Sequence, residues 1–218
     1  MRVIFLGPPG SGKGTQAKLL SSQYHIPHIS TGDIFRDQVN RKTTIGQQLK
    51  KNLAAGMLVS DELTCEIVFK RLEAPDCAGG FILDGFPRTL KQSRDLKDFL
   101  EAKNLRLDSV FYFDIEEAML INRLSQRRQC NGCNRVYNLA SDPPQREGIC
   151  DRCAGALVTR SDDEPNTIHR RLKIYQDLTA PLVEFYENQK LLSRVNAVKS
   201  VNLVTQDLME SLTKFVTR

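Results

Sequence analysis

The sequence predicts an α/β domain in which helices cover both faces of a parallel sheet, giving three layers. Short apolar runs rich in β-branched and aromatic residues recur along the chain, and such runs suit strands buried on both faces. They stand at residues 3–6, 81–83, 110–113 and near 194–198. Segments of helical composition alternate with them, at residues 15–24, 61–73, 89–103, 116–128 and 164–190. Strands that alternate with helices are typical of a parallel sheet.

Length and composition exclude several classes of protein. The chain has 218 residues, of which 40% are hydrophobic, and this suits one α/β core with small insertions and excludes a disordered chain. The formal net charge of +5 permits a polyanionic partner without requiring one. No stretch reaches the roughly 18–20 apolar residues of a membrane span, and the N-terminus lacks the features of a signal peptide. We therefore expect a cytoplasmic protein with no membrane partner.

A glycine-rich loop, GPPGSGKGT at residues 7–15, separates the first expected strand from the first expected helix. In this setting glycines let backbone N–H groups face phosphate oxygens, the helix N-terminus adds positive potential, and Lys13 adds a charge. These features predict a P-loop. The common pattern places a hydroxyl residue directly after the lysine. Here Gly14 stands there and Thr15 follows, so the pattern does not predict a hydroxyl ligand for a metal ion.

Two segments interrupt the alternation of strands and helices. Residues 30–59 predict two short helices, with little room for a strand. Residues 127–160 are rich in Cys, Gly, Pro and Arg and cannot continue the preceding helix. Each segment is expected to form a small lobe on the core. Pro181 is expected to kink or break the helical segment that follows the second lobe.

The cysteine pattern predicts a metal site in the second lobe. Four of the six cysteines form two Cys-x-x-Cys pairs separated by 16 residues: Cys130, Cys133, Cys150 and Cys153. This spacing is typical of a tetrahedral four-thiolate site, in which zinc is the favoured ion and iron the alternative. Four protein ligands leave no position for water, so the site is expected to be structural. The spacing offers no partner for Cys65 or Cys77.

Five strings along the chain resemble the adenylate kinase family of nucleoside monophosphate kinases, in its bacterial form with a long lid. They are GPPGSGKGT; STGD at residues 30–33 with Arg36; DGFPR at residues 84–88 with Gln92; Arg123 with Arg127; and RSDD at residues 160–163 with Arg171 and Leu172. DGFPR is the most specific string, and all five occur in the family's order. The resemblance implies the P-loop NTPase fold with a parallel sheet of five strands. Its core would comprise residues 1–29, 60–126 and 164–218, its AMP-binding lobe residues 30–59, and its zinc-binding lid residues 127–163.

The resemblance implies reversible phosphoryl transfer from Mg-ATP to AMP, which gives two ADP. Such transfer depends on positioning and charge neutralisation more than on acid–base chemistry, and this suits the arginines in the matching strings. On the transferring phosphates the family would place Lys13, Arg88, Arg127, Arg160 and Arg171. ATP would contact Gly10, Ser11, Gly12, Lys13, Gly14, Thr15, Arg123, Arg127, Val136, Tyr137 and Lys199. AMP would contact Thr31, Arg36, Met57, Leu58, Val59, Gly85, Phe86, Pro87, Arg88, Gln92, Arg160 and Arg171.

Some of these residues receive more specific roles from the resemblance. Thr31 and Gln92 would recognise the adenine of AMP, while Arg36 and Arg88 would hold its phosphate. Tyr137 occupies a lid position that contacts the donor nucleotide in the family, although by its sequence alone it could equally belong to the lid core.

Acidic residues fall at positions where they could act on a metal or on arginines. Asp84 ends an apolar strand at the carboxyl edge of the sheet, where ligands of α/β sheets bind. Its expected role is to hold Mg²⁺ through water, and capping of the turn is the alternative. Asp162 and Asp163 would either order the lid hinge by pairing with arginines or cap the following helix. Residues 60–62, Ser-Asp-Glu, are expected to begin a capped helix.

Several positions depart from the family or receive no role. Asn196 and Ala197 stand where bacterial members usually have Asp-Gly, and Met57 replaces a residue that is commonly charged. Lys199 is the nearest candidate for the C-terminal nucleotide contact. The three histidines receive no catalytic role because phosphoryl transfer of this type needs none: His25, His28 and His169.

Two alternatives stay open. The first is a nucleoside monophosphate kinase that acts on another base or another small acceptor. The second is a P-loop protein whose zinc lobe binds nucleic acid, since the lobe carries Arg128, Arg135, Arg146 and Arg152. The lobe has a single tyrosine for stacking and no basic run, which disfavours the second alternative. We expect a monomer that binds ATP, AMP and ADP and no nucleic acid.

Overall fold

A computed structural model describes residues 1–216 of the chain. Five parallel strands form the central sheet, in the order β2-β3-β1-β4-β8. Their bounds are β1 (Arg2–Leu6), β2 (His28–Ser30), β3 (Phe81–Asp84), β4 (Ser109–Asp114) and β8 (Leu192–Asn196). This confirms the α/β class with a parallel sheet of five strands. The strand β2 was not visible in the sequence because Ile29 is its only apolar residue.

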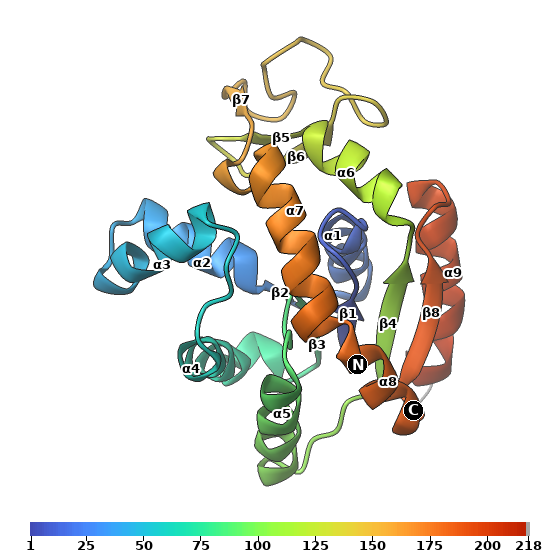
Figure 1. Ribbon diagram of the computed structural model, residues 1–218. Coiled ribbons are helices and arrows are strands. Elements are labelled where there is room, and N and C mark those ends of the chain that lie inside the picture. The colour runs from blue at the N-terminus through green and yellow to red at the C-terminus, as the bar shows by residue number, and fades with distance from the viewer. Residues whose placement is uncertain (217–218) are drawn as a thin grey trace.

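Helices cover both faces of this sheet (Figure 1). Alternate residues of β1 enter two separate cores: Ile4 and Leu6 belong to one, Val3 and Phe5 to the other. The first core also contains residues of α4 (Asp61–Leu72), α5 (Leu90–Ala102) and α8 (Pro181–Asn188). The second contains residues of α1 (Lys13–Tyr24) and α9 (Val201–Val216). Burial on both faces explains why the central strands are apolar throughout.

The chain enters and leaves the lid through two neighbouring helices, α6 (Glu117–Ser125) and α7 (Pro165–Ile174). Leu120, Leu124, Ile168 and Leu172 form the small core between them. One π-helical turn, η3 (Tyr175–Thr179), joins α7 to α8. Pro181 begins α8, so a new helix starts at this proline, where a kink or break was expected.

A lobe of two helices, α2 (Thr31–Asn40) and α3 (Thr44–Ala54), projects from the sheet beside α4 (Figure 1). Phe35, Leu49 and Val59 form its core. Gly46 is required where the helices meet, because a Cβ there would lie 2.0 Å from the carbonyl oxygen of Gln38. The two short helices predicted for this segment are therefore present, and β2 ends where α2 begins.

The lid contains a second sheet, antiparallel, in the order β6-β5-β7. Its strands are β5 (Arg127–Cys130), β6 (Val136–Asn138) and β7 (Leu157–Val158), and a short 3₁₀ turn, η2 (Ser161–Asp163), ends this segment. A second 3₁₀ turn, η1 (Pro75–Cys77), follows α4 in the core. Figure 1 shows the lid above the sheet, next to α6 and α7. Within residues 1–216, no helix combines the length and apolarity needed to cross a membrane.

Candidate active site

A cleft of about 1340 Å³ lies between the carboxyl ends of the central strands, the α2–α3 lobe and the lid. Typical pockets for one small molecule measure about 300–1,000 Å³, so this cleft has room for more than one such ligand. Every residue expected from the sequence to contact nucleotide lines it, with Phe86 as the exception. Segments far apart in the sequence thus meet at one place.

The P-loop shapes one end of the cleft. Gly12 has φ +96°, a left-handed conformation that favours glycine, directly before α1 begins. The Lys13 ammonium donates hydrogen bonds to the carbonyl oxygens of Gly7 and Pro8, both at 2.7 Å, and to Ser11 Oγ at 3.1 Å. Burial lowers the pKa of Lys13 to about 8, although the nearby charge of Asp84 acts in the opposite direction. The Lys13 ammonium therefore binds neutral oxygen atoms of its own loop. Negatively charged phosphate oxygens at this position would form stronger hydrogen bonds with it.

Asp84 lies beside the P-loop at the end of β3. A Cβ at Gly14 would be 3.2 Å from Asp84 Oδ2, so a larger residue directly after Lys13 would crowd the carboxylate. Burial raises the pKa of Asp84, but a hydrogen bond from His28 Nε2 at 3.3 Å and the charge of Lys13 outweigh it and hold the pKa below its usual value. An ionised carboxylate at this position fits Mg²⁺, which binds oxygen ligands and keeps several waters.

A buried carboxylate organises two of the arginines. The Asp163 side chain is fully buried and accepts hydrogen bonds from Arg127 Nε at 2.7 Å and from Arg171 Nη1 at 2.9 Å. Asp162 Oδ2 lies 3.1 Å from Arg171 Nη1. Both acids therefore pair with arginines, and neither side chain caps α7, which favours the first of the two roles that the sequence left open. Arg160 donates to Gln129 Oε1 in the lid.

Two further arginines line the cleft, Arg88 from the loop that follows β3 and Arg36 from α2. Arg88 Nε donates to the Gly85 carbonyl at 2.7 Å. Arg36 donates from Nη2 to Asp33 Oδ1 at 2.6 Å, while its buried Nε has no hydrogen-bond partner. Buried donors are almost always satisfied, so this Nε is an exception, shared within residues 1–216 by Arg2 Nε. Burial, followed by the charge of Arg171, lowers the pKa of Arg88 to about 10.

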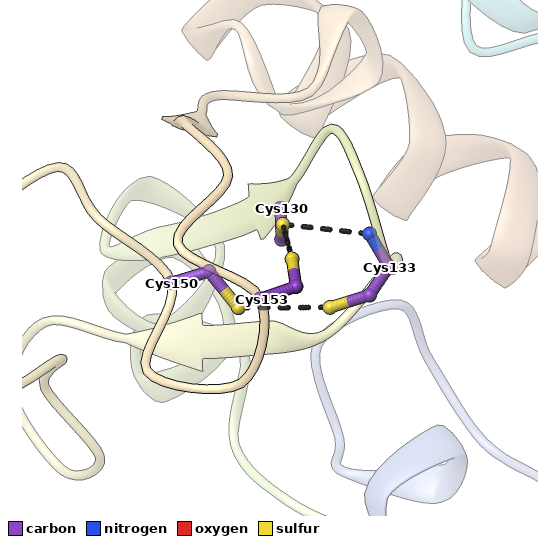
Figure 2. Close-up of side chains that lie close together, drawn as sticks. All are labelled: Cys130, Cys133, Cys150 and Cys153. Carbon is purple, nitrogen blue, oxygen red and sulfur yellow. Dashed lines mark hydrogen bonds between the residues drawn. The ribbon is translucent and has the colours of Figure 1, made fainter.

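The four paired cysteines meet in the lid (Figure 2). Their sulfur atoms all lie within 4.8 Å of one another, with Cys130 and Cys153 at 3.4 Å and Cys133 and Cys150 at 3.6 Å. These distances exclude a disulfide, whose sulfurs are about 2.05 Å apart. Tetrahedral zinc with Zn–S of about 2.3 Å requires sulfurs roughly 3.8 Å apart, which the cluster nearly satisfies. The cysteines therefore fit a four-thiolate metal site.

Comparison with known proteins identifies the family. Residues 5–191 match the family model for adenylate kinase. The adenylate kinase of Clostridium tetani is 45% identical over 212 residues, which cover 97% of this chain and 98% of the relative. That of Finegoldia magna is 46% identical over 214 residues, covering 98% and 100%, and that of Fervidobacterium nodosum is 45% identical over 215 residues, covering 99% of both. This chain belongs to the adenylate kinase family.

Phe86 departs from the expectation for an adenylate kinase AMP site. Its side chain is completely buried in the core beneath the cleft and meets Phe69 edge-on, with ring centroids 6.2 Å apart. It supports the cleft from below and does not line it, because the DGFPR segment turns its phenyl ring toward α4 and α5. Gly85 and Pro87, on either side, do line the cleft, as does the exposed Met57.

Two residues expected at the adenylate kinase donor site have partners within the protein. The Tyr137 ring is buried in the lid core, and its hydroxyl donates to Cys150 Sγ at 3.4 Å and accepts from the Asp151 N–H at 2.9 Å. Lys199 lies 2.6 Å from Asp207 Oδ2 at the cleft margin. Tyr137 therefore serves the lid core, one of the two roles the sequence allowed, while its position still borders the cleft.

Sequence reasoning missed the polar residues that support the adenylate kinase motifs. His28, which received no role, contacts Asp84, and Gln129 contacts Arg160. Only the adjacency of β2 and β3 could have revealed the first contact, and β2 lacks an apolar pattern.

Replacing Tyr137 by phenylalanine is expected to lower the affinity of the four-cysteine site for added zinc about tenfold or more while the fold persists. The substitution removes the hydrogen bond from the hydroxyl to Cys150 Sγ and the one that the hydroxyl accepts from the Asp151 N–H, and it keeps the buried ring. Loss of an outer-shell hydrogen bond typically lowers metal affinity by about 10–100-fold. Competition with a chromogenic chelator measures the change, and Tyr24→Phe, outside the lid, is the control. Equal zinc affinity of the two variants would contradict the role of the hydroxyl.

Proposed function

We propose that this chain reversibly transfers a phosphoryl group from Mg-ATP to AMP, giving two ADP. The observation that carries the proposal is an excess of buried positive charge around one cleft. Burial lowers the pKa of Arg88, Arg160 and Arg171, and neighbouring arginine charges lower each further. Such mutual repulsion is relieved when a polyanion enters. Membership of the adenylate kinase family supports ATP and AMP as the two polyanions.

In this reaction an oxygen of the AMP phosphate attacks the γ-phosphorus of ATP. A new P–O bond forms there, and the bond from the γ-phosphorus to the β,γ-bridging oxygen breaks, so that ADP remains on each side. The P-loop and Lys13 would hold the donor phosphates, while Arg36 and Arg88 would hold the acceptor phosphate. Arg127, Arg160 and Arg171 would neutralise the charge that spreads over the transferring group. Positioning and electrostatics supply most of the catalysis in such transfers.

Two metals are implied by the proposal. Mg²⁺, when bound with ATP, reduces the charge repulsion between the phosphates, and Asp84 is the residue that would hold it through water. Zinc is proposed for the four cysteines as a structural ion, with iron as the alternative. Thiolates saturate this site, so it would offer no position for water or substrate.

In the proposed domain organisation, the P-loop and Asp84 belong to the core, which comprises residues 1–29, 60–126 and 164–218. Residues 30–59 form the AMP-binding lobe. Residues 127–163 form a lid that would close over the phosphates and exclude water, which otherwise competes as acceptor. That the protein is a cytoplasmic monomer without a nucleic-acid partner stays a prediction.

The direct test is incubation with Mg-ATP and, separately, AMP, GMP, CMP, UMP or no acceptor, with ADP formation followed in time. We expect rapid ADP formation with AMP and little with the others. A preferred acceptor other than AMP would favour the alternative kinase. If AMP gives no more ADP than water does, the proposal is wrong.

ATP binding at pH 8 is expected to take up about half a proton through Lys13, whose pKa of about 8 leaves about half the ammonium neutral. Phosphate charge raises this pKa again, so binding favours the protonated form. Because the pKa of Lys13 is lower in the folded protein than in the unfolded chain, burial of the charged lysine lowers the free energy of unfolding. This loss of stability is complete below about pH 8, and it shrinks as the pH rises from 8 toward the pKa of the unfolded state. Calorimetric titrations in two buffers of different ionisation enthalpy measure the uptake. A Lys13→Arg variant, charged throughout this range, should show less uptake; the same uptake would contradict the assignment.

A further inference from the structure

The buried amide of Gln92 borders the cleft and has a defined orientation. Gln92 is 2% exposed and lies in the first turn of α5. Its Oε1 accepts a hydrogen bond from the Arg88 backbone N–H at 2.7 Å, and its Nε2 donates to Asp61 Oδ1 at 2.7 Å. A backbone N–H can only donate and a carboxylate can only accept. The two partners therefore settle which end of the amide is oxygen and which is nitrogen.

Asp61 is itself held in place. Its second oxygen, Oδ2, accepts a hydrogen bond from Thr89 Oγ1 at 3.0 Å, and Thr89 Oγ1 accepts from the Gln92 backbone N–H at 3.1 Å. The three side chains thus form a closed set of hydrogen bonds between the start of α4 and the start of α5. Asp61 was expected only to favour the N-terminus of a helix. The structure shows that its carboxylate also points at Gln92.

The amide keeps one hydrogen and one lone pair for a ligand. Nε2 carries two hydrogens and Oε1 two lone pairs, and each group uses one with its protein partner. An adenine edge offers an acceptor at N1 beside a donor at the 6-amino group, which is the complement of this amide. Hypoxanthine offers the reverse, a donor at N1 beside an acceptor at O6, and would pair only with the flipped amide.

We propose that Asp61 is a specificity-determining positioning residue, which selects an adenine acceptor over a 6-oxopurine by preventing the Gln92 amide from flipping. The inference rests on the proposed function, since it takes AMP as the acceptor and Gln92 as the residue that reads its base. A flip would turn Oε1 toward the Asp61 carboxylate and Nε2 toward the Arg88 N–H, so that both hydrogen bonds become repulsive contacts. Leaving buried polar groups unpaired is what lets a binding site reject a close analogue strongly.

The test compares AMP with IMP, whose bases differ at positions 1 and 6, in the Asp61→Asn variant. An asparagine can present either its oxygen or its NH₂ group to Gln92, so one of the two constraints on the flip is lost. We expect the ratio of kcat/KM for AMP to that for IMP to fall about tenfold or more, the effect of one hydrogen bond. The KM for ATP should stay unchanged, because Asp61 does not line the cleft.

The matched control is Glu62→Gln, which removes the adjacent acid of the same helix turn. Glu62 is exposed and pairs with Lys91 at 2.9 Å, away from Gln92. Its variant should keep the wild-type ratio. A merely structural role of Asp61 would lower kcat/KM for AMP and IMP together and leave the ratio unchanged, which would overturn the proposal.

A second measurement uses the unsubstituted protein and does not depend on how the variant folds. In ¹⁵N-resolved spectra, one of the two Gln92 side-chain amide protons should exchange slowly with deuterium, because it is bonded to Asp61. Rapid exchange of both protons would overturn the proposal. If the wild-type protein phosphorylates no AMP, the proposed function itself fails. If the wild-type protein phosphorylates AMP selectively but Asp61→Asn leaves the AMP-to-IMP ratio of kcat/KM unchanged, only the role of Asp61 is refuted.

Discussion

Replacing Asp163 by asparagine is expected to lower kcat about a hundredfold and the free energy of unfolding by about 3–5 kcal/mol. The Asp163 carboxylate is fully buried and accepts hydrogen bonds from both Arg127 and Arg171. Asparagine keeps the shape but removes the negative charge, so Arg127 loses its carboxylate partner and Arg171 keeps only Asp162. Displacement of these guanidinium groups by even about 1 Å would misplace the charge that is proposed to stabilise the transferring phosphoryl group. Initial rates of ADP formation and denaturant unfolding measure the two effects.

The control for this prediction is Asp162→Asn. Asp162 is slightly exposed, at 14% of its side chain, and its carboxylate forms an ion pair with Arg171. Its loss should cost less, on the order of 1–2 kcal/mol, because Asp163 still accepts hydrogen bonds from both arginines. The interpretation would be contradicted if the two substitutions had equal effects, or if Asp163→Asn destabilised the protein without changing kcat.

Removing the metal proposed for the four cysteines is expected to abolish hydrogen-exchange protection across residues 127–160 while β1 and β4 stay protected. The buried part of the lid consists of little more than Cys130, Tyr137 and Cys150. Structural zinc contributes roughly 10–16 kcal/mol in small zinc-binding peptides, far more than such a small core could supply. ADP formation should fall with the protection, because Arg127 and Arg160 stand at the two ends of the lid. Hydrogen exchange with mass spectrometry, before and after chelation, measures the change.

The Cys150→Ser variant should reproduce the effect of the chelator, whereas Cys77→Ser provides the control. Cys77 is buried in the core outside the cluster, and its variant should retain zinc and lid protection. Equal protection of lid and core with and without metal would contradict a structural site. Metal analysis of the purified protein distinguishes zinc from iron.

The P-loop and the cysteine pairs were visible in the sequence because each motif is contiguous and its spacing is local. The P-loop needs its glycines and lysine within a few residues, and each Cys-x-x-Cys pair supplies two ligands from one turn. The alternation of apolar runs with helical segments was enough for the α/β class. The short strand β2 escaped because its pairing with β3 depends on backbone hydrogen bonds and not on side-chain hydrophobicity.

The sequence by itself therefore determined the fold class, the P-loop, the four-cysteine cluster and the residues gathered at the cleft. Only the tertiary structure decided which partner each polar group takes. It paired Asp163 with Arg127 across 36 positions, His28 with Asp84 across 56 and Asp61 with Gln92 across 31. It also turned Phe86 into the core. An aspartate in the sequence does not indicate which donor its carboxylate will bind. Only the folded chain brings distant donors within hydrogen-bond distance of it.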